Sequence, residues 1–126
     1  MIWCESATNM EECRIMDNLF SNLPKPNPIL VTNRDLKIVG INEEWVDMCG
    51  ISPFGAFGNS PRILQGELTN MDCASNFASN ICQNNSAWVS IINYKNTEDR
   101  RVPFVNHLYG WSFGDIIIAE TYMIDN

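Results

Sequence analysis

The chain has 126 residues, 45% hydrophobic and 18% charged, which is the size and balance of one globular domain. Its formal net charge of −7 argues against binding to nucleic acid or to an anionic membrane surface. No apolar run approaches the roughly 18 residues of a membrane-spanning helix, and the N-terminus lacks a secretory signal pattern. We therefore expect an intracellular protein, cytoplasmic or nuclear.

The cysteines argue for reduced thiols and against a metal site. There are five of them, an odd number, and no pair has the two-residue spacing of a zinc site. The only histidine is His107. We expect each cysteine to pack as a small apolar residue.

Residues 1–27 are predicted to be a flanking segment outside the main domain. Cys13, Met16 and Phe20 recur at helical spacing within it. Such a helix would dock either on the domain or on a partner chain.

The proline-rich residues 23–28 exclude regular structure and lead into a domain predicted over residues 28–126. Two strands are predicted over residues 29–32 and 37–41, because an Asn-Arg-Asp turn cluster separates two apolar runs. A helix is predicted over residues 42–50, where an asparagine caps its start and a glycine ends it.

Residues 58–66 have the pattern of a tight entry into a short helix. Ser60 can cap the first free amides, and Pro61 suits the first helical position. Arg62 and Gln65 are three apart and share one face, so together they could hold an anionic, hydrogen-bonding ligand. A capped surface loop without a ligand would show the same local pattern.

The second half is predicted to begin with a helix over residues 71–84 and to continue as three strands, residues 87–94, 101–109 and 115–123. A turn is expected at residues 110–114. Two strands, several short helices and three sequential strands predict an α+β domain. We expect a five-stranded antiparallel sheet with short helices on one face.

Four polar residues fall where their elements are expected to face a core: Asn93, Asn106 and Glu120 on strands, and Gln65 on the helix opposite. An unpartnered buried amide costs about 1–3 kcal/mol, so converging amides predict a polar ligand. The alternative is that these residues face solvent on an open sheet.

The order of elements and several motifs resemble the LOV subclass of PAS domains, which bind a flavin and sense blue light. The family signature Gly-Arg-Asn-Cys-Arg-Phe-Leu-Gln is matched by Gly-Asn-Ser-Pro-Arg-Ile-Leu-Gln at residues 58–65. Ile-Asn-Tyr at residues 92–94 resembles the family's Leu-Asn-Tyr, and Phe-Val-Asn at residues 104–106 resembles its Phe-Trp-Asn. The resemblance covers about residues 28–123.

This resemblance implies a site for FMN or another flavin. Arg62 would meet the phosphate and Gln65 the ribityl chain. Asn93 and Asn106 would bond the pyrimidine edge of the isoalloxazine ring. A guanidinium suits a phosphate, and an amide matches the donors and acceptors of that edge.

The chain also departs from the family pattern. Pro61 takes the place of the photoactive cysteine, so a cysteinyl–flavin adduct cannot form there. Ser60 replaces an asparagine and is retained as a flavin contact with a shorter side chain. Ala78 falls at a second phosphate-binding arginine. Glu120 aligns with the glutamine near flavin N5, which makes it the candidate proton-linked responder.

Other side chains could supply redox chemistry. Cys49 is a candidate substitute thiol, and Trp45, Trp88 and Trp111 are candidate electron donors to an excited flavin. For all four, packing is the simpler interpretation.

Two functions from different classes follow. The first is a LOV-like PAS signalling module that binds a flavin non-covalently and responds by photoreduction or redox change. The alternative is a cofactor-free PAS domain that forms homodimers or binds a partner protein through its flanking segment, with Cys13, Leu19 and Phe20 as the surface. We do not expect an enzyme, because the sequence shows no nucleophile–base pair, phosphate loop or metal cluster.

Overall fold

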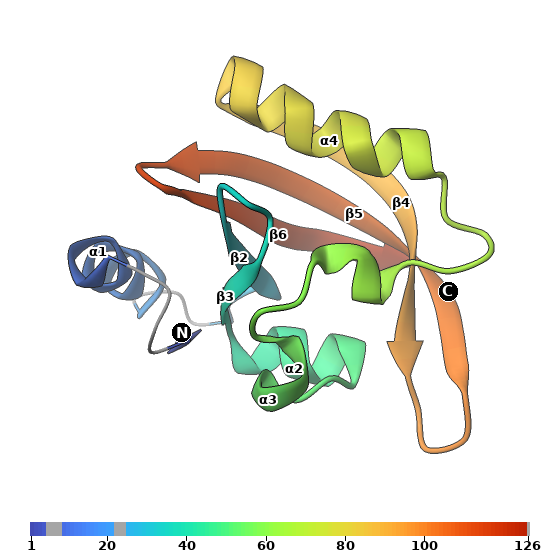
Figure 1. The fold of residues 1–126 in the computed structure, drawn as a ribbon. Coiled ribbons are helices and arrows are strands. Elements are labelled where there is room, and N and C mark those ends of the chain that lie inside the picture. Colours follow the sequence, from blue (N-terminus) through green and yellow to red (C-terminus); the bar gives the residue numbers. More distant parts are fainter. Residues whose placement is uncertain (5–8, 22–24, 126) are drawn as a thin grey trace.

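The computed structural model describes residues 1–4, 9–21 and 25–125. In chain order the elements are β1 (Ile2–Trp3), α1 (Met10–Ser21), β2 (Ile29–Asn33), β3 (Ile38–Ile41), α2 (Glu43–Cys49), α3 (Pro53–Ala56), the 3₁₀ helix η1 (Pro61–Leu64), α4 (Met71–Asn84), β4 (Ser86–Asn96), β5 (Arg101–Phe113) and β6 (Ile116–Asp125). The strands form one antiparallel sheet in the order β1-β3-β2-β6-β5-β4 (Figure 1). The predicted α+β class is confirmed.

The sheet has six strands, so the prediction of five is wrong. The additional strand is β1, in which Ile2 and Trp3 pair with Ile41 and Gly40. Gly40 makes this pairing possible, since a Cβ there would lie 2.5 Å from the Trp3 ring. Two residues are too short to show alternation in a sequence. That residues 28–126 fold without the flanking segment stays a prediction.

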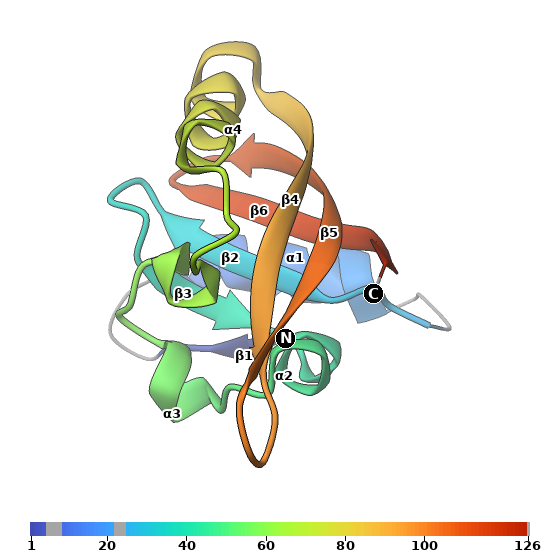
Figure 2. The ribbon, with the colours of Figure 1, turned by 90° about the vertical axis from the view of Figure 1, so that its right-hand side faces the viewer.

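The helices of residues 28–126 lie on one face of the sheet, as expected, and α1 of the flanking segment covers the other face (Figures 1 and 2). Figures 1 and 2 show α1 on one side and α2, α3 and α4 on the other. Met16 of α1 is buried against Val31, Val39 and Ile118 on what we call the outer face of the sheet. The inner face packs against α2, α3 and η1.

Local capping signals predict the β2–β3–α2 region well. Asn33 Oδ1 accepts hydrogen bonds from the backbone N–H groups of Asp35 and Lys37, both at 3.0 Å, and so holds the turn between β2 and β3. Asn42 caps α2 by accepting from Trp45 N at 3.0 Å. Gly50 ends the helix with a φ of 67°. The proline-rich stretch predicted over residues 23–28 lies partly outside the described residues.

The turn predicted at residues 110–114 is wrong over most of its length. β5 continues to Phe113, and β6 starts at Ile116. Gly110 lies within β5 and not in a turn. It allows α4 to pack closely, because a Cβ there would overlap the side chains of Ile81 and Phe77. The glycine therefore marks the close approach of a helix to a strand.

Candidate functional site

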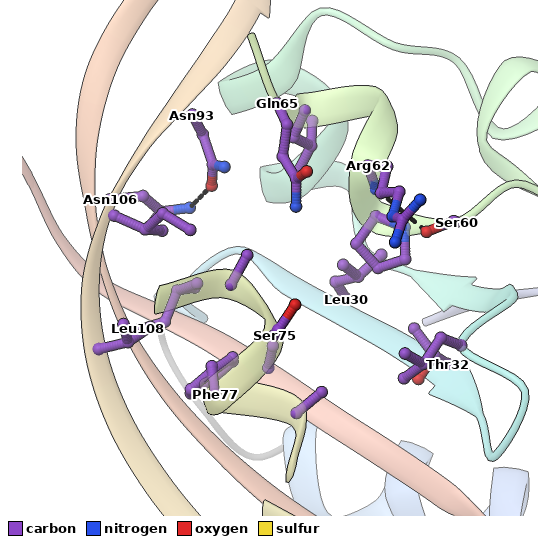
Figure 3. Close-up of a pocket in the computed structure, with 18 of the residues that line it drawn as sticks. Leu30, Thr32, Ser60, Arg62, Gln65, Ser75, Phe77, Asn93, Asn106 and Leu108 are labelled. Atoms are coloured by element: carbon purple, nitrogen blue, oxygen red, sulfur yellow. Dashed lines mark hydrogen bonds between the residues drawn. The ribbon is translucent and has the colours of Figure 1, made fainter. Parts of the chain in front are cut away.

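A cavity of about 560 Å³ lies between α4, η1 and the inner face of the sheet (Figure 3). This volume is within the range of about 300–1,000 Å³ typical of small-molecule sites. Apolar side chains make up much of its wall: Leu30, Trp45, Leu64, Phe77, Ile91, Leu108, Ile117 and Ala119. Polar groups are placed at two separate regions of this wall, described next.

The first polar region is the start of η1. Ser60 caps η1 by accepting from Arg62 N at 3.2 Å, and Pro61 occupies the first helical position, as predicted. All three residues line the cavity. Arg62 is exposed and forms no ion pair with any residue that the structure describes. Its guanidinium is therefore available to an anionic group.

The end of η1 is held by β5. Arg101 Nη2 donates to the carbonyl oxygens of Ile63 and Gln65, at 2.9 and 3.0 Å. The same guanidinium lies 5.0 Å from the centre of the Tyr94 ring. These contacts fix the backbone from which the Gln65 side chain enters the cavity (Figure 3).

The second polar region consists of three buried side chains on the neighbouring strands β4, β5 and β6. Asn106 Nδ2 donates to Asn93 Oδ1 at 2.9 Å, and Thr121 Oγ1 donates to Asn106 Oδ1 at 2.8 Å. All three are at most 5% exposed and line the cavity. The predicted convergence of Asn93 and Asn106 on a core-facing site is observed.

The structure places five of the six predicted contacts in the wall of this cavity: Ser60, Arg62, Gln65, Asn93 and Asn106. Ala78 also lies in the wall, on α4, so the position implied for a second arginine carries no charge. The five predicted contacts come from η1 and its two caps, from β4 and from β5, and the fold brings them around one space. Whether they bind a ligand stays a prediction.

Glu120 is not among the residues that line the cavity, so its expected placement is wrong. Its neighbours Ala119 and Thr121 line the cavity, and alternation along β6 turns Glu120 to the outer face. There Glu120 Oε1 accepts from Asn27 Nδ2 at 2.8 Å. The error is one residue of register, which reverses the face of every side chain in a strand. Thr121 is the site residue that the sequence prediction missed.

The predicted redox candidates separate by position. Cys49 is fully buried in the core behind α2, and burial raises the pKa of its thiol to about 12. No cysteine is among the cavity-lining residues that the structure describes. Trp45 lines the cavity, whereas Trp88 and Trp111 belong to an aromatic cluster with Tyr109 on the outer face.

His107 does not stand alone, contrary to expectation. Ser90 Oγ lies 2.6 Å from His107 Nδ1, and His107 Nε2 lies 2.9 Å from Asp125 Oδ2. A nucleophile–base pair is thus present in geometry, on neighbouring strands. None of the three lines the cavity described above or the second cavity, which lies beside the N-terminal residues and α1. Acyl transfer also needs donors for an oxyanion and a place for the substrate.

Comparison with solved structures relates this architecture to known folds. The LOV domain of a blue-light activated histidine kinase from Erythrobacter litoralis EL346 matches with a TM-score of 0.66 and 21% identity, over 79% of this chain and 94% of that one. The fold is that of LOV domains. The Rhodobacter sphaeroides LOV protein matches with a TM-score of 0.75 and 16% identity, over 90% of this chain and 67% of that one. The light-state Aureochrome1 LOV structure gives 0.69 and 17%, over 89% and 90%.

No protein-family model and no curated protein matches the chain. The LOV likeness is therefore one of fold, and it confirms the predicted PAS architecture. None of the described helices is long and apolar enough to cross a bilayer. The described residues also contain no group of three or more metal-binding side chains.

Proposed function

We propose that this chain is a LOV-like PAS sensory module that binds a flavin, FMN or a close relative, non-covalently in the cavity described above. One observation carries the proposal: Arg62 and Gln65 are distant in sequence from Asn93 and Asn106, and all four line one cavity of ligand size. The LOV fold of the chain supports the same assignment.

The chemistry of the cavity fits a flavin. The apolar wall suits the faces of a flat aromatic ring, and the buried amides of Asn93 and Asn106 suit its carbonyl and N–H groups. Arg62 suits a phosphate, as an exposed guanidinium without an acidic partner among the described residues. With an alanine at position 78, Arg62 would hold that phosphate without help from an arginine there on α4.

A bound flavin would supply a redox-active ring that absorbs blue light. Pro61 offers no nucleophile in the cavity wall, and the buried Cys49 thiol lies elsewhere. We therefore propose that the response is a redox or photoreduction change and not a bond to a thiol. The chain's own contribution is to bind the ring, orient it through the asparagine amides and shield it from water.

The first test is the absorption spectrum of freshly purified protein, followed by FMN titration monitored by flavin fluorescence. We expect flavin bands near the visible blue, and a loss of affinity of about tenfold or more in Arg62→Ala, since a hydrogen bond to a charged group contributes about 1.5–3 kcal/mol. Glu120→Gln is the matched control, because its side chain is outside the cavity wall, and it should bind FMN as the wild type does.

Two results would contradict this proposal. One is colourless protein, purified from a flavin-sufficient host, that takes up no added FMN. The other is an Arg62→Ala variant that binds FMN as the wild type does, together with a Glu120→Gln variant that does not bind FMN. That result would assign the ligand contact to Glu120 and not to Arg62.

A second candidate function is protein association without a cofactor, in a homodimer or with a partner protein. Exposed apolar side chains on β4 and β6 favour it: Trp88 is 65% exposed, and Tyr122, Met123 and Ile124 are about half exposed. The expected contact surface on α1 is smaller than predicted, because Phe20 packs near Trp111 and leaves Leu19 exposed. Sedimentation of wild type and Trp88→Ser over a wide concentration range distinguishes a dimer from a monomer.

The remaining expectations are kept as proposals. They are an intracellular location, no conventional enzymatic activity, and no binding of nucleic acid or membrane by this domain. The net charge of −7 supports the last of these.

A further inference from the structure

The hydrogen bonds at the buried polar region form a chain with a direction. Thr121 Oγ1 donates to Asn106 Oδ1, and Asn106 Nδ2 donates to Asn93 Oδ1. The Thr121 hydroxyl gives its one proton to Asn106 Oδ1, which leaves Asn106 Nδ2 to donate onward, because an amide oxygen only accepts and an amide nitrogen only donates. Among the described residues Thr121 is the one donor to Asn106 Oδ1, so its hydrogen bond holds the Asn106 amide in the orientation that donates to Asn93.

The last member of the chain is Asn93, whose Nδ2 is turned toward the cavity side where Gln65 lies (Figure 3). Among the described residues its partner is the carbonyl oxygen of Ile92, at the long distance of 3.5 Å. Asn93 is only 5% exposed, so leaving its Nδ2 donor with this weak hydrogen bond costs free energy that a better acceptor would recover. This chain of hydrogen bonds thus presents the Asn93 N–H group to whatever occupies the cavity.

We propose that Thr121 is a positioning residue that holds the asparagine amides in this orientation, so that the cavity selects ligands with a hydrogen-bond acceptor, such as a ring carbonyl, at Asn93. The proposal rests on the proposed function, in which the ligand is a flavin. The pyrimidine ring of a flavin carries carbonyl oxygens of this kind. Thr121 acts through Asn106 and need not touch the ligand itself.

The protein contains a second threonine that serves as a matched control for Thr121. Thr32 is also a strand threonine in the cavity wall, and like Thr121 it is 4% exposed. Thr32 Oγ1 has no hydrogen-bond partner among the described residues. Replacing either threonine by valine changes the same atoms, but only Thr121→Val removes a hydrogen bond.

The experiment compares wild type, Thr121→Val, Thr121→Ser and Thr32→Val. FMN is the probe for binding, and the side-chain amide signals of Asn93 and Asn106 are recorded by ¹⁵N NMR in the protein without added ligand. We expect Thr121→Val to weaken FMN binding at least about fivefold and to shift both amide signals. Thr121→Ser should restore both, and Thr32→Val should leave both amide signals at their wild-type positions.

Each outcome decides something. Unshifted amide signals in Thr121→Val would overturn the positioning role, whether or not FMN binds. So would wild-type FMN affinity in that variant, or a folded Thr121→Ser that restores neither readout. If wild type binds no FMN, the flavin proposal fails, and the NMR arm still decides the role of Thr121. Urea unfolding of every variant separates these effects from a general loss of stability.

Discussion

Cys49 is the last residue of α2 and lies among the apolar side chains between that helix and the sheet. Burial raises the pKa of its thiol from 9.0 to about 12. The thiolate is the reactive form of cysteine, so the Cys49 thiol is unreactive near neutral pH. Its position also makes the thiol a reporter of folding.

The raised pKa of Cys49 predicts a loss of stability in alkali. The folded state keeps the thiol neutral while the unfolded state ionises it, so this contribution is present below pH 9 and is lost as the pH rises toward 12. In Cys49→Ala, the fall in the free energy of unfolding between about pH 9 and 11 should be shallower by up to about 1.4 kcal/mol per pH unit.

Urea denaturation at a series of pH values measures this slope. Cys82→Ala removes the thiol of an exposed cysteine and serves as the control for the substitution itself. Parallel curves for wild type and Cys49→Ala would show that the thiol is not buried in the way described.

At the scale of elements, α4 packs closely against β5 at Gly110. Gly110 has no Cβ, and the side chains of Phe77 and Ile81 occupy the space that one would need. Phe77 also forms part of the cavity wall. The distance of α4 from the sheet therefore sets the width of the cavity.

Gly110→Ala is expected to push α4 away from β5 and to lower the free energy of unfolding by about 1–3 kcal/mol, the usual cost of overpacking. Gly55→Ala is the control, since the nearest atoms to a Cβ there are 3.5 Å away, an ordinary contact. Chemical denaturation of both variants is the measurement. Equal stability in the two would mean that α4 can shift without cost.

Elements governed by neighbouring residues could be predicted from the sequence. The caps Asn42 and Ser60 and the helix over residues 71–84 depend on local chemistry, and all three are observed. β1 could not be predicted, because two residues form a strand only where Gly40 leaves room for Trp3. Features fixed by residues close in sequence can therefore be predicted, whereas a feature fixed by a contact between distant residues cannot.

The sequence predicts a site residue correctly where the pairing register of its strand is well defined. Asn93 and Asn106 lie on long paired strands and face the cavity as expected. Glu120 was placed on the wrong face, because alternation gives two equivalent faces and the sequence does not say which one meets α1. Thr121, the residue beside it, belongs to the site.

At the scale of the whole molecule, α1 gives the sheet a second core. Met16 is 1% exposed and packs against β2, β3 and β6. Glu12 adds a polar contact by accepting from Asp115 N at 3.1 Å. The flanking segment is thus part of the folded unit that the structure describes, although the sequence also allowed it to dock on a partner chain.

Met16→Ala is expected to lower the free energy of unfolding by about 2–5 kcal/mol, because it leaves a cavity in this second core. Met10→Ala, at the exposed start of the same helix, should change it by no more than about 0.5 kcal/mol. Met10 is 84% exposed. Urea denaturation of the two variants tests whether α1 is docked in solution, and a small loss in Met16→Ala would argue that it is not.

β6 separates the cavity from α1 by the thickness of one strand. Ala119 and Thr121 face the cavity, and Ile118 between β6 and α1 belongs to the outer core. If a ligand shifts β6, it changes the free energy with which α1 docks. Thermodynamic linkage then makes the effect reciprocal: a partner that draws α1 off the sheet would change ligand affinity by the same factor. If the cavity binds a ligand as proposed, binding can be sensed, and the affinity tuned, through the N-terminal helix.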